Sequence, residues 1–312
     1  MRLSQYYEQM LFAPKWYHLP LILLLLPLSL LYGVFMWVRR KMARRHTLGL
    51  PIVSVGNLIV GGSGKTPFVI AMASKYEGVF VISRGYGRES RGLVEVSRRG
   101  DILVTVKESG DEPMLIAKSL PNASVIVSED RHKAIALARV KGAKLIILDD
   151  GFNRVEIEKF EILLEPQHIA NPLPFPAGPF REFAFCKEAA DVVAKEGRDF
   201  ERVVTYENLQ EKMLLVTAIS HPERLEPFLP KGVVAKVLLP DHAYFDEESL
   251  RRKMAETGVQ SLLVTQKDAV KMEDLSLPLS VMKLELKISY DIVDSVESYV
   301  KGFEGEKQDR SC

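Results

Sequence analysis

One short segment has the composition of a phosphate-binding loop. It follows the β-branched run "PIVSV" and precedes "KTPFVIAMASKY", so it lies between a predicted strand and a predicted helix. Its members are Gly61, Gly62, Ser63, Gly64, Lys65 and Thr66. Glycines let backbone N–H groups point at phosphate oxygens, and a helix N-terminus adds positive potential. In such a loop the lysine reaches the β- and γ-phosphates and the following hydroxyl holds Mg²⁺. A purely structural glycine-rich turn is the alternative interpretation.

The spacing of this loop departs from the usual signature, G-x-x-x-x-G-K-[ST]. Counting back five places from Gly64 gives Ile59, where a glycine is expected. We expect Gly56 or Asn57 to shape the tight turn that Ile59 cannot make.

A second stretch supplies carboxylates that suit a metal ion. "KLIILDDGF" runs from Lys144 to Phe152 and ends its apolar run at Asp149 and Asp150. This resembles the second motif of nucleoside triphosphatases, in which a strand delivers a carboxylate to Mg²⁺. The nucleotide is expected to be ATP rather than GTP. A guanine-specific N/T-K-x-D element would be needed for GTP, and the lysine of "TQKDAVK" stands one place late.

Two further residues are candidates for handling a hydroxyl proton. Asp111, in "ESGDEPMLIA", follows a glycine and opens a predicted helix. It is either a helix cap or the carboxylate that takes the proton during phosphoryl transfer. His242, in "LPDHAYF", follows a predicted strand, where ligands of α/β sheets sit. It is either structural or the partner that assists such a base.

Arginines and glycines also gather in "SRGYGRESRG", residues 83–92. Forked guanidiniums on a flexible backbone suit a phosphate group, and a solvated loop is the alternative. No basic face extends beyond this patch and the net charge is +1, so nucleic acid is not an expected partner.

The elements that must position these residues alternate as in a parallel-sheet α/β fold. Predicted strands are Ile52–Val55, Val79–Ser83, Ser124–Val127, Leu145–Leu148 and Glu161–Leu164, with a hairpin over Leu93–Val106 that turns at Arg99–Gly100. Predicted helices are Lys65–Tyr76, Glu112–Leu120 and Arg131–Lys141. Residues 166–181 carry five prolines and predict a long loop without regular structure, which is usually functional or disordered.

A second alternating run begins near Met213 and predicts a smaller sheet with a helix over Asp246–Thr257. The sequence thus predicts a membrane-anchoring segment over 1–46, a nucleotide-binding domain over 47–211, a smaller α/β domain over 212–303 and a frayed polar tail over 304–312. Apolar residues are 47% and charged residues 27%, a globular balance. Cys186 and Cys312 cannot form a disulfide framework, which fits a reducing compartment.

The N-terminal part contains an apolar stretch long enough for one bilayer crossing. Leu19–Val38 lies in a gap without charged residues and is bent, we expect, at Pro20, Pro27 and Gly33. It lies too far from the start and lacks the cleavage site of a signal peptide. A basic collar follows, made of Arg39, Arg40, Lys41, Arg44 and Arg45. The collar favours membrane attachment with the C-terminal part in the cytoplasm, by a span or in one leaflet. A buried core helix is the alternative.

Taken together, the motifs resemble the tetraacyldisaccharide 4′-kinase family of lipid A biosynthesis. The resemblance runs from the apolar segment to about residue 285 and rests on "VGNLIVGGSGKTP", "SRGYGR", "SGDEP", "EDR", "DDGF", "PAGPFRE", "PDHAYF" and "TQKDAVK". In this family the loop glycines fall as they do here, so a missing glycine at position 59 is a family trait.

The resemblance implies an ATP- and Mg²⁺-dependent kinase that phosphorylates the 4′-hydroxyl of a tetraacylated glucosamine disaccharide 1-phosphate. It implies two α/β/α layers with the active site in the cleft between them. Lys65 and Thr66 would bind nucleotide phosphate and metal, Asp149 and Asp150 would be the metal-side pair, and Asp111 would be the base supported by His242. Arg84, Arg131 and Arg181 match basic residues around the phosphates or the lipid. The protein would act as a monomer on the cytoplasmic side of the membrane.

Two departures from the family pattern stand out. Asn153-Arg154 replaces the usual Gln-His after "DDGF", which puts a substrate contact there in doubt, and Ala243 replaces a second histidine after His242. A membrane-tethered regulatory ATPase without a small acceptor remains an alternative, as does a non-enzymatic scaffold. The first leaves Asp111 with His242 and the proline-rich loop unexplained, and the second leaves Gly-Lys-Thr unused.

Overall fold

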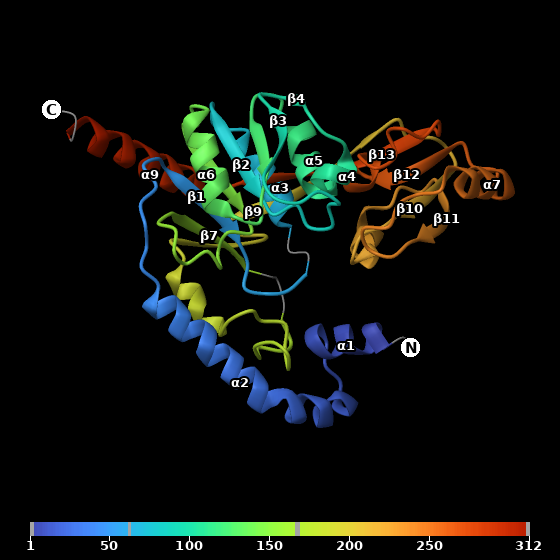
Figure 1. Cartoon of the computed structure of the whole chain (residues 1–312). Helices are drawn as coiled ribbons and strands as arrows, with labels where there is room; N and C mark the ends of the chain where they lie inside the picture. The colour runs from blue at the N-terminus through green and yellow to red at the C-terminus, as the bar shows by residue number, and fades with distance from the viewer. Residues whose placement is uncertain (1–2, 62–63, 166–168, 310–312) are drawn as a thin grey trace. The chain divides into compact units, whose positions relative to one another are not determined.

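The computed structural model describes residues 3–61, 64–165 and 169–309, with helices and strands placed as in Figure 1. The chain divides into two compact units, and each collects separate stretches of sequence. The first unit takes Met1–Lys65, Leu145–Phe200 and Ile288–Cys312, and the second takes Thr66–Lys144 and Glu201–Lys287. The sequential boundaries near residues 46, 211 and 303 stay predictions.

Parallel strands form the centre of the first unit. Their order is β6 (Leu145–Asp149), β1 (Ile52–Gly56), β7 (Phe160–Glu165) and β8 (Val192–Lys195). Each neighbouring pair is parallel, and every residue of β1 and β6 is buried. Burial on both faces explains why these strands read as continuous apolar runs. The predicted strands here are confirmed to within one residue at each end.

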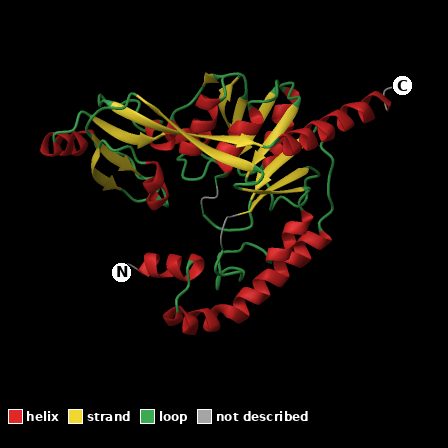
Figure 2. Ribbon diagram, turned by 180° about the vertical axis from the view of Figure 1, so that it is seen from behind, coloured by secondary structure: helices red, strands yellow, loops and turns green. Residues whose placement is uncertain are grey.

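An N-terminal helical arm belongs to the same unit. It comprises α1 (Leu3–Phe12), the 3₁₀ turn η1 (Trp16–His18) and α2 (Leu19–Met42). Helix α2 continues through Pro27 and Gly33, where the sequence predicted bends. The stretch Trp16–Met42 is long and apolar enough to cross a membrane, with a mean hydropathy of 2.4 over an 18-residue window within it. After α2 the chain runs as an extended connection, drawn as a loop in Figure 2, before it enters β1.

Helix α2 buries one face and exposes the other. The buried positions Ile22, Ser29, Gly33 and Met36 recur at helical spacing. They meet the proline-rich loop: Ser29 Oγ donates to the Pro174 carbonyl, and a Cβ on Gly33 would lie 2.7 Å from the Phe183 ring. In Figure 1 this loop and the 3₁₀ turn η2 (Ala184–Ala189) run along α2.

The C-terminal end of the chain is helical where the sequence predicted a frayed tail. Helix α9 runs from Tyr290 to Asp309, past the expected limit at Glu304. Apolar residues at Ile292, Val296 and Tyr299 share one face, and the Tyr299 hydroxyl accepts a hydrogen bond from the Ile52 amide at 3.3 Å. Packing of Tyr299 against β1 and Phe160 therefore stabilises α9, whose polar composition did not predict a helix.

The second unit contains the other strands in two groups. One group runs β4 (Asp101–Ile102), β3 (Val94–Arg98), β5 (Ser124–Val127) and β2 (Val79–Ser83). The other is a five-stranded sheet in the order β11 (Val233–Leu238), β10 (Met213–Thr217), β12 (Ser261–Thr265), β13 (Leu279–Ile288) and β9 (Phe200–Glu207). The expected smaller sheet is thus present, and β9 enters it before residue 211. The predicted hairpin is confirmed as β3–β4, except that Val106 begins a helix.

Short helices flank these strands. They are α4 (Val106–Ser109), α5 (Asp111–Ser119), α6 (Arg131–Val140), η3 (Pro222–Phe228), α7 (Glu247–Thr257) and α8 (Gln266–Ala269). Helix α3 (Lys65–Ala73) begins where the two units join along the chain. Asp130, Asp246 and Thr265 each accept a backbone N–H in the first turn of the helix that follows them, which fixes where those helices begin. The predicted α/β class is confirmed.

Candidate active site

The segment before the glycines of the loop is held by the proline-rich loop. The Val60 amide donates to the Pro179 carbonyl at 2.9 Å, and the Arg181 amide donates to the Leu58 carbonyl at 2.7 Å. Ile59 and Phe180 form the bridge between the two segments, and both are buried. Position 59 therefore carries an apolar anchor rather than a turn, which gives a physical reason for the missing glycine. The same pairing places Arg181 beside the loop.

Gly56 allows Phe152 to pack closely against the backbone, whereas the sequence predicted that Gly56 or Asn57 would shape a tight turn. A Cβ at this position would lie 2.5 Å from the Cβ of Phe152. The left-handed backbone of the loop instead occurs at Gly61 and Gly64, with φ of 90° and 78°. Asn57 contributes a side chain, because its Oδ1 atom accepts a hydrogen bond from Lys65 Nζ at 3.1 Å. Gly62 and Ser63 lie outside the described residues.

Asp150 stands between two cations in the first unit. Nη1 of Arg181 donates to both of its carboxylate oxygens, at 2.9 and 3.1 Å, and Lys65 Nζ lies 3.6 Å from Oδ1. Asp150 has φ of 57°, an uncommon conformation for a residue other than glycine. Asp149 ends strand β6 and is buried. The structure thus brings together Lys65, Asp150 and Arg181, three residues that the sequence predicted for the site.

The oxygen donors in this region match the preferences of Mg²⁺. Thr66 offers a hydroxyl, and Asp149 and Asp150 offer carboxylates at the end of one strand. Mg²⁺ takes oxygen ligands and is commonly bound through one or two carboxylates plus substrate phosphates. Over residues 3–61, 64–165 and 169–309 no group of three or more His, Cys, Asp or Glu residues forms a complete metal cage. This donor set fits an ion that arrives with a nucleotide.

A second group of candidates meets in the second unit. Nδ1 of His242 lies 3.0 and 3.1 Å from the two carboxylate oxygens of Asp111, which is buried at 5% exposure. Asp111 is the first residue of α5 and directly follows Gly110, whose φ is 87°. His242 has φ of 61°, and its amide donates to the Ala218 carbonyl at 3.1 Å. The backbone on both sides is therefore fixed in conformations that aim these two side chains at each other.

Two lysines complete this group. Lys267 Nζ lies 3.6 Å and Lys271 Nζ 3.7 Å from Asp111 Oδ2. Lys271 also lies 3.6 Å from Asp268 Oδ1, and Asp268 is fully buried. The Asp268 carboxylate accepts hydrogen bonds from Thr217 Oγ1 and the Ala218 amide, so α8 is tied to the end of β10. The "TQKDAVK" segment argued against guanine recognition and supported the family resemblance, but neither inference predicted these two lysines as site residues. Lys267 lies on α8 and Lys271 in the turn that follows it.

Burial and the neighbouring cations act in opposite directions on the pKa of Asp111. Burial raises the pKa of its carboxyl, but the hydrogen bond with His242 and the positive charges of Lys267 and Lys271 outweigh burial and hold the pKa below its ordinary value. The hydrogen bond to Asp111 raises the pKa of His242, against burial and the charge of Lys267. Asp111 is therefore held as a carboxylate and His242 is biased toward the imidazolium.

The remaining predicted arginines occupy different surroundings. Arg84 is exposed and follows β2, and Arg131 is buried at the start of α6, where Nη1 donates to the Ser128 carbonyl. Both belong to the second unit, whereas Arg181 belongs to the first. The structure does not bring these three arginines into one cluster within a unit.

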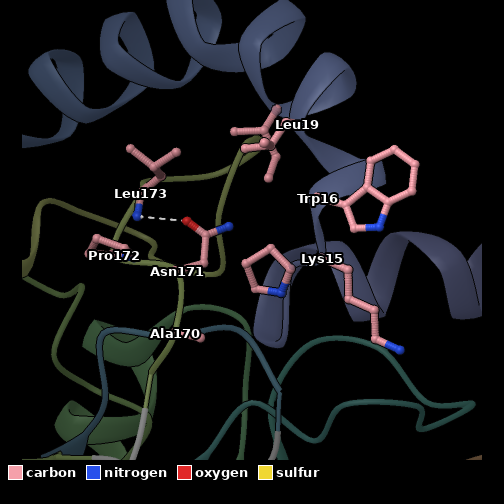
Figure 3. Close-up of a pocket in the computed structure, with 9 residues that line it drawn as sticks. Lys15, Trp16, Leu19, Ala170, Asn171, Pro172 and Leu173 are labelled. Carbon is pink, nitrogen blue, oxygen red and sulfur yellow. Dashed lines mark hydrogen bonds between the residues drawn. The ribbon is translucent and has the colours of Figure 1, made fainter.

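An apolar cavity of about 410 Å³ lies within the first unit. Figure 3 shows that its walls come from the segment that joins α1 to α2, from the start of α2 and from the proline-rich loop. The lining residues include Trp16, Leu19, Ile22, Ala170 and Leu173. The Leu173 amide donates to Asn171 Oδ1 at 3.1 Å, and Asn171 Nδ2 donates to the Ala177 carbonyl at 2.8 Å, so the loop wall is internally braced.

Comparisons with known proteins agree with the resemblance in the sequence. A family model described as tetraacyldisaccharide-1-P 4′-kinase matches residues 21–301. A tetraacyldisaccharide 4′-kinase of Helicobacter pylori is 44% identical over 298 residues, covering 95% of each chain. One of Aliarcobacter butzleri is 45% identical over 305 residues, covering 95% of this chain and 97% of the relative. Among solved structures, LpxK of Aquifex aeolicus in complex with ATP matches with a TM-score of 0.75 at 27% identity, covering 91% of this chain and 99% of that one.

Proposed function

Because the chain belongs to the tetraacyldisaccharide-1-P 4′-kinase family, we propose that it transfers the γ-phosphoryl group of ATP to the 4′-hydroxyl of a tetraacylated glucosamine disaccharide 1-phosphate. The observation that carries this proposal is the buried Asp111 carboxylate held by His242, in a chain that also has the Lys65–Asp150–Arg181 group. A protein that only hydrolyses ATP to switch a partner has no need of a base reserved for an acceptor hydroxyl.

The phosphate loop and its partners handle the nucleotide. Backbone N–H groups at the start of α3 and the Lys65 ammonium bind the phosphates, and Lys65 is prepositioned by Asn57. Arg181 is held by Asp150 at the same loop, where its guanidinium suits a phosphate oxygen. Bound Mg²⁺ would neutralise charge on the β- and γ-phosphates. Thr66, Asp149 and Asp150 are the proposed oxygen donors to it.

The acceptor side of the transfer belongs to Asp111. The oxygen of the 4′-hydroxyl forms a bond to the γ-phosphorus, the bond from that phosphorus to the leaving oxygen of ADP breaks, and the hydroxyl proton passes to an Asp111 oxygen. A lowered pKa makes Asp111 a weak base, which is adequate because the transition state is loose and the proton leaves late. His242 orients the carboxylate by holding both of its oxygens.

Arg84 and Arg131 are proposed to contact phosphate groups of the nucleotide or the lipid. Arg84 is exposed within a glycine-rich segment whose Gly85 and Gly87 have positive φ, so the backbone there can approach a ligand closely. Arg131 lies at the N-terminus of α6, where helix potential also favours an anion.

We also propose that the protein works at the cytoplasmic face of a membrane, with α2 lying in one leaflet. The outward face of α2 exposes leucines and aromatic residues that include Leu24, Leu31 and Phe35, whereas its other face rests on the proline-rich loop. A helix packed against protein along most of its length is suited to the interface rather than to a crossing. Lys41, Arg44 and Arg45 are exposed beside it and suit anionic headgroups.

The cavity beside the start of α2 is the proposed seat for part of an acyl chain. Its lining is predominantly apolar, and it adjoins the helix that would rest among lipid tails. A lipid with acylated sugars could keep its chains in the bilayer while its headgroup reaches the catalytic residues.

The test uses purified protein, Mg-ATP and the disaccharide 1-phosphate in detergent. A mass gain of one phosphoryl group on the lipid supports the kinase. ATP hydrolysis that is independent of the lipid, without a mass gain, supports the regulatory ATPase. Monomeric assembly stays a prediction.

A further inference from the structure

Two of the collar arginines donate hydrogen bonds to the protein. Nε of Arg40 donates to Glu182 Oε2 at 2.7 Å, and its Nη2 donates to Glu182 Oε1 at 2.9 Å. The Arg40 side chain is 8% exposed and that of Glu182 is fully buried. Arg39 Nη2 donates to the Asn153 carbonyl at 2.8 Å. The sequence predicted that the whole collar faces lipid headgroups, but the Arg40 side chain, which is 8% exposed and bonded to Glu182, is directed into the protein.

Arg40 also holds the turn that follows the metal-side carboxylates. Its Nη2 donates to the Phe152 carbonyl at 3.1 Å, and its Cζ lies 4.1 Å from the centroid of the Phe152 ring. Phe152 is buried against Gly56 at the end of β1. One guanidinium therefore fixes the backbone two residues after Asp150 and the ring that packs on the strand before the phosphate loop.

The other partner of Arg40 leads to the same carboxylate. Glu182 directly follows Arg181, which grips Asp150, and Asp150 lies 3.6 Å from Lys65. Phe183, the next residue, meets Gly33 of α2 so closely that a Cβ there would lie 2.7 Å away. The seat of α2, the position of Arg181 and the position of Asp150 thus share one chain of contacts within the first unit, which runs from the buried Glu182 to the partly exposed Arg181–Asp150 pair.

We propose that Arg40 is a positioning residue for the nucleotide site. Arg40 lies near the end of α2 and contacts Glu182, the neighbour of Arg181, and Phe152, two residues after Asp150. Helix α2 therefore forms part of the support for the phosphate loop. This inference rests on the proposed function, because it assumes that Lys65, Asp150 and Arg181 bind the nucleotide. Arg40 acts through Glu182 and Phe152 and touches no substrate.

The experiment compares Arg40→Gln with Lys41→Gln in the full chain. Lys41 is the next residue and is exposed, so its variant removes the same formal charge from the collar without touching the buried contacts. ATP affinity is measured in detergent without lipid acceptor. Separate assays with the acceptor give kcat and the lipid KM, and thermal denaturation gives the unfolding midpoint. Arg40→Gln should weaken ATP binding roughly tenfold, the usual size of an indirect coupling, and lower kcat. Lys41→Gln should bind ATP as the wild type does.

A double-mutant cycle with Arg181→Gln separates positioning from general destabilisation. If Arg40 acts through Arg181, the loss of ATP affinity in the double variant is smaller than the product of the two single losses. If the two single losses multiply in the double variant, the effects are independent and the inference is overturned. Wild-type ATP affinity in Arg40→Gln would also overturn it, as would a change in Arg40→Gln that is confined to the lipid KM.

Arg40→Lys carries the test if Arg40→Gln does not fold. Lysine keeps the charge but cannot donate to two carboxylate oxygens and a carbonyl at once. The ATP affinity of Arg40→Lys should lie between those of the wild type and Arg40→Gln. If Arg40→Gln does not fold, the ATP affinity of Arg40→Lys should still be clearly lower than that of the wild type. Wild-type affinity overturns the inference. Absence of ATP binding by the wild-type protein would instead defeat the proposed function.

Discussion

Nδ1 of His242 contacts both carboxylate oxygens of Asp111, at 3.0 and 3.1 Å, although 131 residues separate the two in the sequence. The pair is flanked by Lys267 and Lys271 and is largely withdrawn from solvent. A buried carboxylate surrounded by cations is held ionised and in a fixed orientation. These are the properties that a proton acceptor in phosphoryl transfer requires.

Asp111→Asn keeps the shape of the side chain and removes the proton acceptor. We expect kcat to fall by roughly 10²- to 10⁴-fold, the range for loss of general-base assistance, while ATP affinity stays near that of the wild type. Single-turnover kinetics with ATP titration measure both quantities. Near-normal turnover in this variant would remove Asp111 from the role of base.

The ion pair between Asp111 and His242 gives stability a defined dependence on pH. The pKa of Asp111 is lowered, so its contribution is present above its unfolded pKa of about 3.9 and is lost as pH falls through the folded value. The pKa of His242 is raised, so its contribution is present below its unfolded pKa of about 6.5 and is lost as pH rises through the folded value.

The difference in unfolding midpoint between the wild type and His242→Gln should therefore be larger at pH 6 than at pH 9. Thermal denaturation across this range measures it. In an Asp111→Asn background the His242 substitution should show a smaller pH dependence, because the charge of Asp111 is gone and only Asp241 still favours the imidazolium. A midpoint difference that does not change with pH would contradict the pairing.

Lys65→Ala removes the ammonium that Asn57 and Asp150 hold at the loop. We expect a loss of ATP affinity together with a loss of kcat, because the proposed contact of this lysine with the phosphates would act in both the ground and the transition state. Lys75→Ala, at an exposed position two residues after the end of α3, is the matched control and should leave both unchanged. Isothermal titration and steady-state kinetics report the two effects, and unaltered ATP affinity in Lys65→Ala would count against the phosphate-loop interpretation.

The outward face of α2 should determine membrane binding. Leu24 and Leu31 are 75% and 67% exposed, and replacing either with Glu should weaken vesicle binding at least about tenfold, because an apolar side chain is withdrawn from lipid. Leu209→Glu, at an exposed position in the second unit, is the control. Vesicle sedimentation measures the partition. Unchanged binding by both α2 variants would show that another surface attaches the protein.

Ala170→Phe should fill the apolar cavity beside α2. Ala170 is an exposed lining residue, so the larger ring can enter the cavity without disturbing a buried contact. The KM for the lipid acceptor should rise and the KM for ATP should stay constant. An unchanged lipid KM would exclude the cavity as an acyl-chain site.

The central strands were predictable because burial on both faces produces unbroken apolar runs bounded by turn residues, as in β1, β2, β5 and β6. Helix α9 was missed because charged residues separate Ile292, Val296 and Tyr299, and only contact with β1 and β7 makes that face apolar enough to matter. The interleaving of the two units was out of reach, since contacts between distant segments leave no local pattern.

Motifs pointed to several candidate residues in the sequence but did not reveal their neighbours. The "DDGF" and "GKT" stretches predicted Asp150 and Lys65, whereas their contacts with Arg181 and Asn57 depend on how the proline-rich loop pairs with residues 58–60. Likewise a basic collar after an apolar helix indicates lipid by composition alone. Only the buried Glu182 shows that Arg40 has a protein partner.

Mass spectrometry of the lipid, after incubation of wild type and Asp111→Asn with Mg-ATP and the tetraacylated disaccharide 1-phosphate, decides whether the protein is a 4′-kinase that uses Asp111. We expect a mass gain of one phosphoryl group at the 4′ position with the wild type and almost none with the variant, although the variant still binds ATP. Lipid that keeps its mass while the wild type consumes ATP, or equal phosphorylation by both proteins, would contradict this expectation.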